Sequence, residues 1–319
     1  MSASADADSR VGASASADIR VGASASAGAG LAESIGTHVA RRGSVASTLR
    51  GLPVGRPYQI FLGNPRSTVQ SAIADAEIAA AAAEAAAHRV YVHSAYTVNL
   101  CRAGSGAQLA RTVELAVAIG CRGVVVHVGK SLGRPVAEAL AEMRANLLVA
   151  AAAATADCPL LLETPAGQGT ELLTGADDFI DFVRACAPAA ARVPAGAGAQ
   201  SGAQSGAQLG AGTLAICVDT CHVFAAGHDP VAYVGRALAS GLLRLVHFND
   251  SATALGSRVD RHAAPGQGHI GAAALAEVAR VCQEANRCRI GAVGAHSARI
   301  GAIEDAPLLS DFIIDLIVE

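Results

Sequence analysis

The chain has 319 residues, of which 52% are hydrophobic and 16% are charged, and its formal net charge is −3. This length suffices for one large domain or two ordinary ones, and the apolar fraction excludes a wholly disordered protein. The slightly acidic balance excludes a polybasic nucleic-acid-binding protein, so any contact with DNA must come from a local basic patch.

The sequence contains no segment of the kind that enters a membrane. No run reaches the roughly 18 uninterrupted apolar residues of a membrane helix, and the first residues lack the basic and apolar regions of a secretory signal. The eight cysteines form no CxxC pair and no regular framework, which is typical of reduced intracellular thiols. We therefore expect a soluble intracellular protein, and the sequence does not decide between nucleus and cytoplasm.

Two segments are of low complexity. Residues 1–30 contain the octet RVGASASA twice, and residues 188–212 contain the tandem SGAQSGAQ. Such Ala/Ser/Gly sequence buries too little apolar area to offset its ordering entropy. The sequence predicts a disordered tail over 1–30, with a partner-binding arm using Arg10 and Arg20 as the alternative. It predicts one domain over 31–319 that carries a flexible insertion at 188–212.

In the rest of the chain, short apolar runs alternate with helical stretches. The strand candidates are 35–39, 58–62, 90–92, 123–126, 159–162, 214–218, 242–246 and, more weakly, 289–293. The helical candidates are 67–87, 107–119, 135–154, 177–187, 272–285 and 306–317. Continuous apolar strands separated by helices indicate a parallel sheet covered on its outer face. Eight such repeats favour an α/β fold of the (β/α)8 type, a TIM barrel, over an open sheet.

Polar residues follow five of these runs directly, and others stand a few positions further on. The eight residues are His93, His127, Glu163, Asp219, His222, His247, Asp260 and His262. Because the carboxyl ends of barrel strands meet at one face, all eight side chains should converge there. Imidazole and carboxylate are ligands of zinc and similar ions, and eight exceed what one tetrahedral zinc requires. The set predicts a multinuclear metal site that activates water and binds a phosphoryl group.

Each of these residues also has a structural interpretation. A single histidine at a strand end is commonly a hydrogen-bonded core residue. Asp219 alone could cap the following helix, and Asp260 with His262 could form a salt-bridged loop. The coincidence at five successive strand ends favours the metal site.

Three segments resemble the endonuclease IV family of apurinic/apyrimidinic (AP) endonucleases. They are LLETPAGQG (161–169), CVDTCHVFAAGHD (217–229) and HFNDSATALGSRVDRHAAPGQGHIG (247–271). The resemblance implies a TIM barrel with three zinc ions that cleaves double-stranded DNA on the 5′ side of abasic sites. It also implies trimming of blocked 3′ ends within base excision repair. We expect the protein to act as a monomer.

The resemblance assigns a role to each of the predicted ligands. His93 and His127 would bind one zinc, and Glu163 would bridge it to a second. The second zinc would be held mostly by Asp219 and His247, and the third by His222, Asp260 and His262. Glu163 and Asp219 are the expected catalytic residues. For DNA, the resemblance implies that Arg66 contacts the strand and that Tyr96 lies near the abasic pocket.

The ninth ligand of the family, a glutamate that ends the last strand, has no counterpart at the expected spacing. Counted from HIG at 269–271, it should fall near residues 292–294, where there is no carboxylate. Glu304 in a shifted register or His296 could replace it, or the second zinc could be under-coordinated, which the sequence slightly favours. The alternatives to an active nuclease are therefore a catalytically weakened DNA-binding homologue or a metal-dependent sugar isomerase or epimerase.

Overall fold

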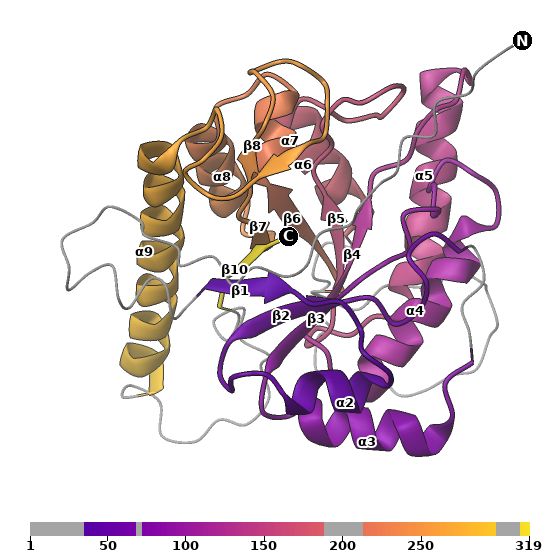
Figure 1. Cartoon of the computed structure of the whole chain (residues 1–319). Coiled ribbons are helices and arrows are strands. Elements are labelled where there is room, and N and C mark those ends of the chain that lie inside the picture. The colour runs from indigo at the N-terminus through magenta and orange to yellow at the C-terminus, as the bar shows by residue number, and fades with distance from the viewer. Residues whose placement is uncertain (1–34, 68–71, 188–212, 298–312) are drawn as a thin grey trace, which may run out of the picture.

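The computed structural model describes residues 35–67, 72–187, 213–297 and 313–319, and for 289–297 it describes the backbone only (Figure 1). The low-complexity segments predicted at 1–30 and 188–212 lie outside these residues. Among the helices of the described ranges, none has both the length and the apolar character needed to span a membrane.

In the described part of the chain, eight parallel strands close into a barrel surrounded by helices (Figure 1). The strands are β1 (Ile35–His38), β2 (Pro57–Ile60), β3 (Arg89–His93), β4 (Gly123–His127), β5 (Leu160–Glu163), β6 (Leu214–Asp219), β7 (Leu243–His247) and β10 (Asp315–Val318). Their order around the barrel is β1–β10–β7–β6–β5–β4–β3–β2, and β2 pairs with β1 to close it. The predicted (β/α)8 barrel is confirmed.

The helices follow the strands and cover the outside of the barrel. They are α2 (Val45–Arg50), α3 (Asp75–Ala85), α4 (Ser105–Ile119), α5 (Val136–Ala151), α6 (Ala176–Cys186), α7 (Thr220–Ala225), α8 (Pro230–Ala239) and α9 (Ala272–Ser297). Local signals set several ends. Asp229 caps α8 by accepting a bond from the Ala232 N–H, and Gly120 adopts a positive φ where α4 ends. The helices α2, α7 and α8 were not predicted.

The strands carry two separate layers of apolar side chains. Outward-facing residues pack against the helices in a large cluster, whereas a smaller cluster fills the barrel interior. The interior residues are Tyr91, Val125, Leu161, Ala215, Cys217, Leu245 and Ile317. Because side chains along a strand alternate with a period of two, the second residue after an interior residue also faces the barrel axis. This alternation decides which residues meet at the mouth of the barrel.

The last strand differs from the sequence-based prediction. Residues 289–293, predicted as the eighth strand, lie in α9, which extends beyond the predicted 272–285. The eighth strand is β10, in a segment predicted as the end of a helix at 306–317. A short apolar run fits either element, and only its pairing with β1 and β7 makes it a strand. Without that strand the barrel would stay open between β1 and β7.

Candidate metal centre

The carboxyl ends of the strands bring polar side chains together inside the mouth of the barrel. The side chains from six strand ends in the described structure are His93, His127, Glu163, Asp219, His247 and Glu319. Each stands two positions after a residue of the interior apolar cluster, as Glu163 does after Leu161 and Glu319 after Ile317. The period-two alternation therefore aims all six at the barrel axis.

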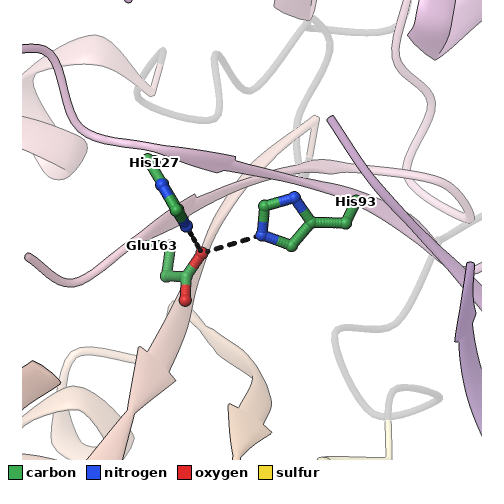
Figure 2. A group of neighbouring side chains, drawn as sticks. All are labelled: His93, His127 and Glu163. Carbon is green, nitrogen blue, oxygen red and sulfur yellow. Dashed lines mark hydrogen bonds and ion pairs between the residues drawn. The ribbon is translucent and has the colours of Figure 1, made fainter. Parts of the chain in front are cut away.

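Glu163 lies at the centre of this group and is fully buried. Its Oε2 lies 3.1 Å from His127 Nε2 and 3.3 Å from His93 Nε2 (Figure 2). Its Oε1 lies 2.9 Å from His247 Nδ1. Burial alone would raise the pKa of Glu163, but His127 and His247 hold that pKa well below its ordinary value. The two oxygens of one ionised carboxylate thus face two different groups of side chains.

A second group of side chains surrounds His247. Glu319 Oε2 lies 3.1 Å from His247 Nδ1, and Asp219 Oδ2 lies 3.7 Å from the same atom. Together with Glu163, these residues bring their ligand atoms within 4.8 Å of one another. Burial alone would raise the pKa of Glu319, but the charge of His247 holds it well below its ordinary value. Three carboxylates therefore converge on a single imidazole.

The expectation that the last strand contributes no carboxylate is wrong, because Glu319 directly follows β10 and joins this second group. Of the residues considered for that place, His296 lies on α9 with an undescribed side chain, and Glu304 lies outside the described residues. The signal was present in the sequence, since DLIVE at 315–319 repeats the pattern of LLLE at 160–163. The family spacing counted from residues 269–271 points instead to 292–294, which lie within α9, whereas Glu319 follows a strand that comes after the end of that helix.

The third group consists of His222, Asp260 and His262. Asp260 Oδ1 lies 3.2 Å from the Nε2 atoms of both histidines. The short antiparallel strands β8 (Asp250–Ser251) and β9 (His262–Ala263) pair across this loop and hold His262 over the barrel. Asp219 caps α7 by accepting a bond of 2.9 Å from the His222 N–H. Asp219 therefore caps α7 and also lies among the candidate ligands.

Hydrogen bonds fix the orientation of three of these rings. The Nδ1 of His93 lies 2.7 Å from the Ser94 carbonyl oxygen, and the Nδ1 of His222 lies 2.8 Å from that of Thr164. His247 uses the other ring nitrogen, because its Nε2 lies 2.9 Å from the side-chain oxygen of Gln59. Because a carbonyl oxygen only accepts, each of these nitrogens carries a hydrogen. In the neutral ring the opposite nitrogen then turns a lone pair towards the carboxylates.

This arrangement fits divalent metal ions. Lone pairs and carboxylate oxygens that face one another at close range repel unless a cation lies between them, and this donor set is the one zinc prefers. The Nε2 atoms of His222 and His262 are buried, and although Asp260 Oδ1 lies 3.2 Å from each, no contact in the described part of the chain has the geometry of a hydrogen bond to them. Burial alone would lower the pKa of His222, yet Asp219 and Asp260 raise it well above its ordinary value. In the metal-free protein, a proton bound to His222 therefore supplies positive charge that a metal ion would otherwise provide.

Comparisons with known proteins show which family the chain belongs to. Residues 57–193 and 207–281 match the model of a family described as xylose isomerase-like TIM barrel. A probable endonuclease 4 of Symbiobacterium thermophilum is 36% identical over 239 residues, which cover 70% of this chain and 78% of that protein. A probable endonuclease 4 of Streptomyces avermitilis is 34% identical over 268 residues, covering 74% and 77%. This chain belongs to the endonuclease 4 family.

Solved structures support the same assignment. Endonuclease IV from Thermus thermophilus is similar with a TM-score of 0.60 and 28% identity, over 89% of this chain and 92% of that one. A D-tagatose 3-epimerase-like protein has a TM-score of 0.54 at 15% identity, over 77% and 86%, a likeness of fold alone. The predicted family is confirmed, and it is a family of nucleases. The family model ends at residue 281, so Glu319 lies beyond the matched range.

In this member of the endonuclease 4 family, a cavity of about 280 Å³ opens above the three groups. Its lining includes Tyr96, His127, Lys130, Asp260 and Glu319. Lys130 is the only lysine of the chain and lies 3.3 Å from Glu171 across the cavity rim. The cavity therefore joins the candidate ligands to the loops that follow β3 and β4.

The structure places the two predicted DNA contacts on adjoining loops. Tyr96 is 54% exposed, and its ring centroid lies 5.3 Å from that of His93 and 5.8 Å from that of His127. Arg66 is exposed on the loop after β2, and the Tyr96 N–H bonds the Pro65 carbonyl oxygen beside it. Tyr96 therefore lies against the candidate ligands, and Arg66 lies on the adjoining loop. The DNA-contact roles of both residues stay predictions.

Proposed function

We propose that this chain is a zinc-dependent AP endonuclease. It hydrolyses the phosphodiester bond on the 5′ side of abasic sites in double-stranded DNA, leaves a 3′-hydroxyl, and trims blocked 3′ ends in base excision repair. We propose that it does so inside the cell as a monomer. The observation that carries the proposal is the meeting of three ligand groups at one barrel mouth, with Glu319 supplying the ninth side chain.

The three groups divide the proposed zinc ions among them. The first ion would be held by His93, His127 and Glu163, the second by Glu163, Asp219, His247 and Glu319, and the third by His222, Asp260 and His262. When bound, such ions lower the pKa of a coordinated water and neutralise charge on phosphoryl oxygens. Glu163 would contribute to both of the first two sites, because its two oxygens face different groups. Asp219 ties the second site to the third through its cap on His222.

The rim supports a preference for abasic sites. A nucleotide without a base has little stacking to lose, so moving it out of the duplex costs less than flipping an intact nucleotide. The cavity beside Tyr96 has room for a sugar, and Tyr96 would pack against it while shielding the histidines from water. Arg66 would contact a phosphate nearby, which gives the locally basic contact that an acidic chain needs.

The two alternative functions lose support. The weakened DNA-binding homologue rested on the missing ninth carboxylate, and Glu319 supplies that group. An isomerase or epimerase on the same barrel needs one or two metal ions, so the third group around Asp260 would have no metal ion to bind. The likeness to an epimerase-like structure concerns the fold alone.

The test is incision of a duplex that carries one synthetic abasic site, with the undamaged duplex as the substrate control. We expect a cut on the 5′ side of the lesion with a 3′-hydroxyl product, and its loss in the variant Asp219→Ala. Because this change also removes a helix cap, the matched control is Asp229→Ala, which removes the cap of α8 and no candidate ligand. Equal cutting of both duplexes, or full activity of Asp219→Ala, would contradict the proposal.

A further inference from the structure

Gln59, in the N-terminal part of the chain, links two candidate ligands from its C-terminal part. It lies on β2 with its side chain fully buried. Its side-chain oxygen lies 2.9 Å from His247 Nε2, and its side-chain nitrogen lies 2.5 Å from Glu319 Oε1. His247 ends β7 and Glu319 directly follows β10, and both belong to the second group. Neither sequence motif nor family resemblance drew attention to this glutamine.

The contact with Glu319 decides which way the amide of Gln59 points. An ionised carboxylate only accepts hydrogen bonds, so the amide nitrogen must be the atom that faces it. The amide oxygen then faces His247, and because that oxygen only accepts, His247 must carry its hydrogen on Nε2. The Nδ1 of His247 is left to face Glu319, Glu163 and Asp219. The amide thus fixes the tautomer of His247. It also helps to hold Glu319, together with His38, whose Nδ1 lies 3.1 Å from the amide nitrogen and 3.3 Å from Glu319 Oε1.

Gln59 differs from the groups that orient the other rings. His93 and His222 donate to the backbone carbonyl oxygens of Ser94 and Thr164, which no substitution removes. His247 depends on a side chain. Since Gln59 is fully buried, water has no access to replace either of its bonds.

We propose that Gln59 is a positioning residue that sets the zinc affinity of the second group. It holds His247 with Nδ1 directed inward and holds Glu319 against the same point, so that both are arranged before the metal binds. An uncharged amide suits this place, because it donates to Glu319 and accepts from His247 without adding a charge. This inference rests on the proposed zinc sites and deepens that proposal.

The experiment measures zinc release from the full chain during competition with a chelator. In the variant Gln59→Met, which keeps the volume and loses both bonds, we expect one of three ions to bind about 10- to 100-fold more weakly. The other two ions should be held as in the unchanged protein. The matched control is Asn286→Met. Its amide braces the start of β10 through two bonds to Ile314, away from the ligands, so its zinc release should not change.

A second readout follows the ring hydrogen of His247 by nuclear magnetic resonance in the zinc-loaded protein. The Nε2–H bonded to a buried acceptor should exchange slowly in the unchanged protein and rapidly in Gln59→Met. Gln59→Glu keeps an acceptor for this hydrogen, so slow exchange should return there. This variant also serves if Gln59→Met does not fold.

The outcomes separate the inference from the function on which it rests. Unchanged release of all three ions from Gln59→Met, or rapid exchange of the ring hydrogen in the unchanged protein, overturns the role of Gln59. Loss of zinc from Asn286→Met to the same extent also overturns it, because loosening of β10 would then be sufficient. An unchanged protein that binds no zinc overturns the proposed function itself.

Discussion

Glu163 shows how a buried charge is retained in this protein. Four histidines contact it, at distances of 2.9 to 3.6 Å, and it has no exposure to solvent. An ionised carboxylate without partners would cost several kcal/mol in such a place. The four histidines around Glu163 are themselves candidate metal ligands. The same groups that would bind the metal therefore stabilise the buried charge.

Arg66 offers a direct test at the scale of a residue. If its guanidinium contacts a DNA phosphate, Arg66→Ala should weaken binding of abasic and undamaged duplex by a similar factor. It should also reduce the slope of log affinity against log salt by about 1, because one fewer counterion is released. The measurement is a salt titration of binding by fluorescence anisotropy. The matched control is Arg280→Ala, an exposed arginine paired within α9, and an equal effect of both changes would refute the contact.

The loop that follows β9 depends on one side chain, Asp250. Its carboxylate is buried and accepts backbone N–H bonds from Gly266, Gly268 and Ile270. In Asp250→Ala these donors lose their acceptor, and we expect the free energy of unfolding to fall by about 3 kcal/mol. Urea denaturation measures it, with the exposed Asp157→Ala as the control. A change below about 0.5 kcal/mol, as at an ordinary surface site, would contradict this role.

The elements differ in how far the sequence could predict them. Seven strands were recognisable as short apolar runs, and five ligand positions because such a run ended in a histidine or carboxylate, as at Glu163 and His247. β10 has the same signal in DLIVE, but a short apolar run is compatible with a helix, and its partners lie far away in the chain. Gln59 could not be predicted, since a lone glutamine in a strand has no pattern. Its role appears only when the barrel brings Glu319 to it.

The effect of pH on the stability of the whole molecule should differ between the metal-free and the zinc-loaded protein. In the metal-free protein, burial alone would lower the pKa values of His222 and His247. Asp219 raises that of His222 and the neighbouring Cys217 and Glu319 raise that of His247, both well above the ordinary 6.5. Their contribution is fully present below pH 6.5 and is lost as the pH rises through the raised values. The lowered pKa of His93 acts in the opposite sense and is a single group.

Bound zinc would displace these protons, so its binding should become more favourable as the pH rises. We therefore expect the increase in Tm that zinc produces to grow between pH 6.5 and pH 9. Scanning calorimetry of chelator-treated and zinc-loaded protein measures this difference. Glu163, Glu319 and Asp260 stay ionised throughout this window, because their pKa values are lowered. A Tm difference that is constant or falls with pH would contradict the exchange of protons for metal.

We propose that one barrel mouth holds three metal ions between nine side chains, with Glu319 completing the second site. The most direct test is the number of zinc ions per chain, counted by native mass spectrometry on protein loaded with zinc and freed of loosely bound metal. We expect three ions in the unchanged protein and two in Glu319→Gln. One or two ions in the unchanged protein, or three retained at unchanged affinity in Glu319→Gln, would contradict it.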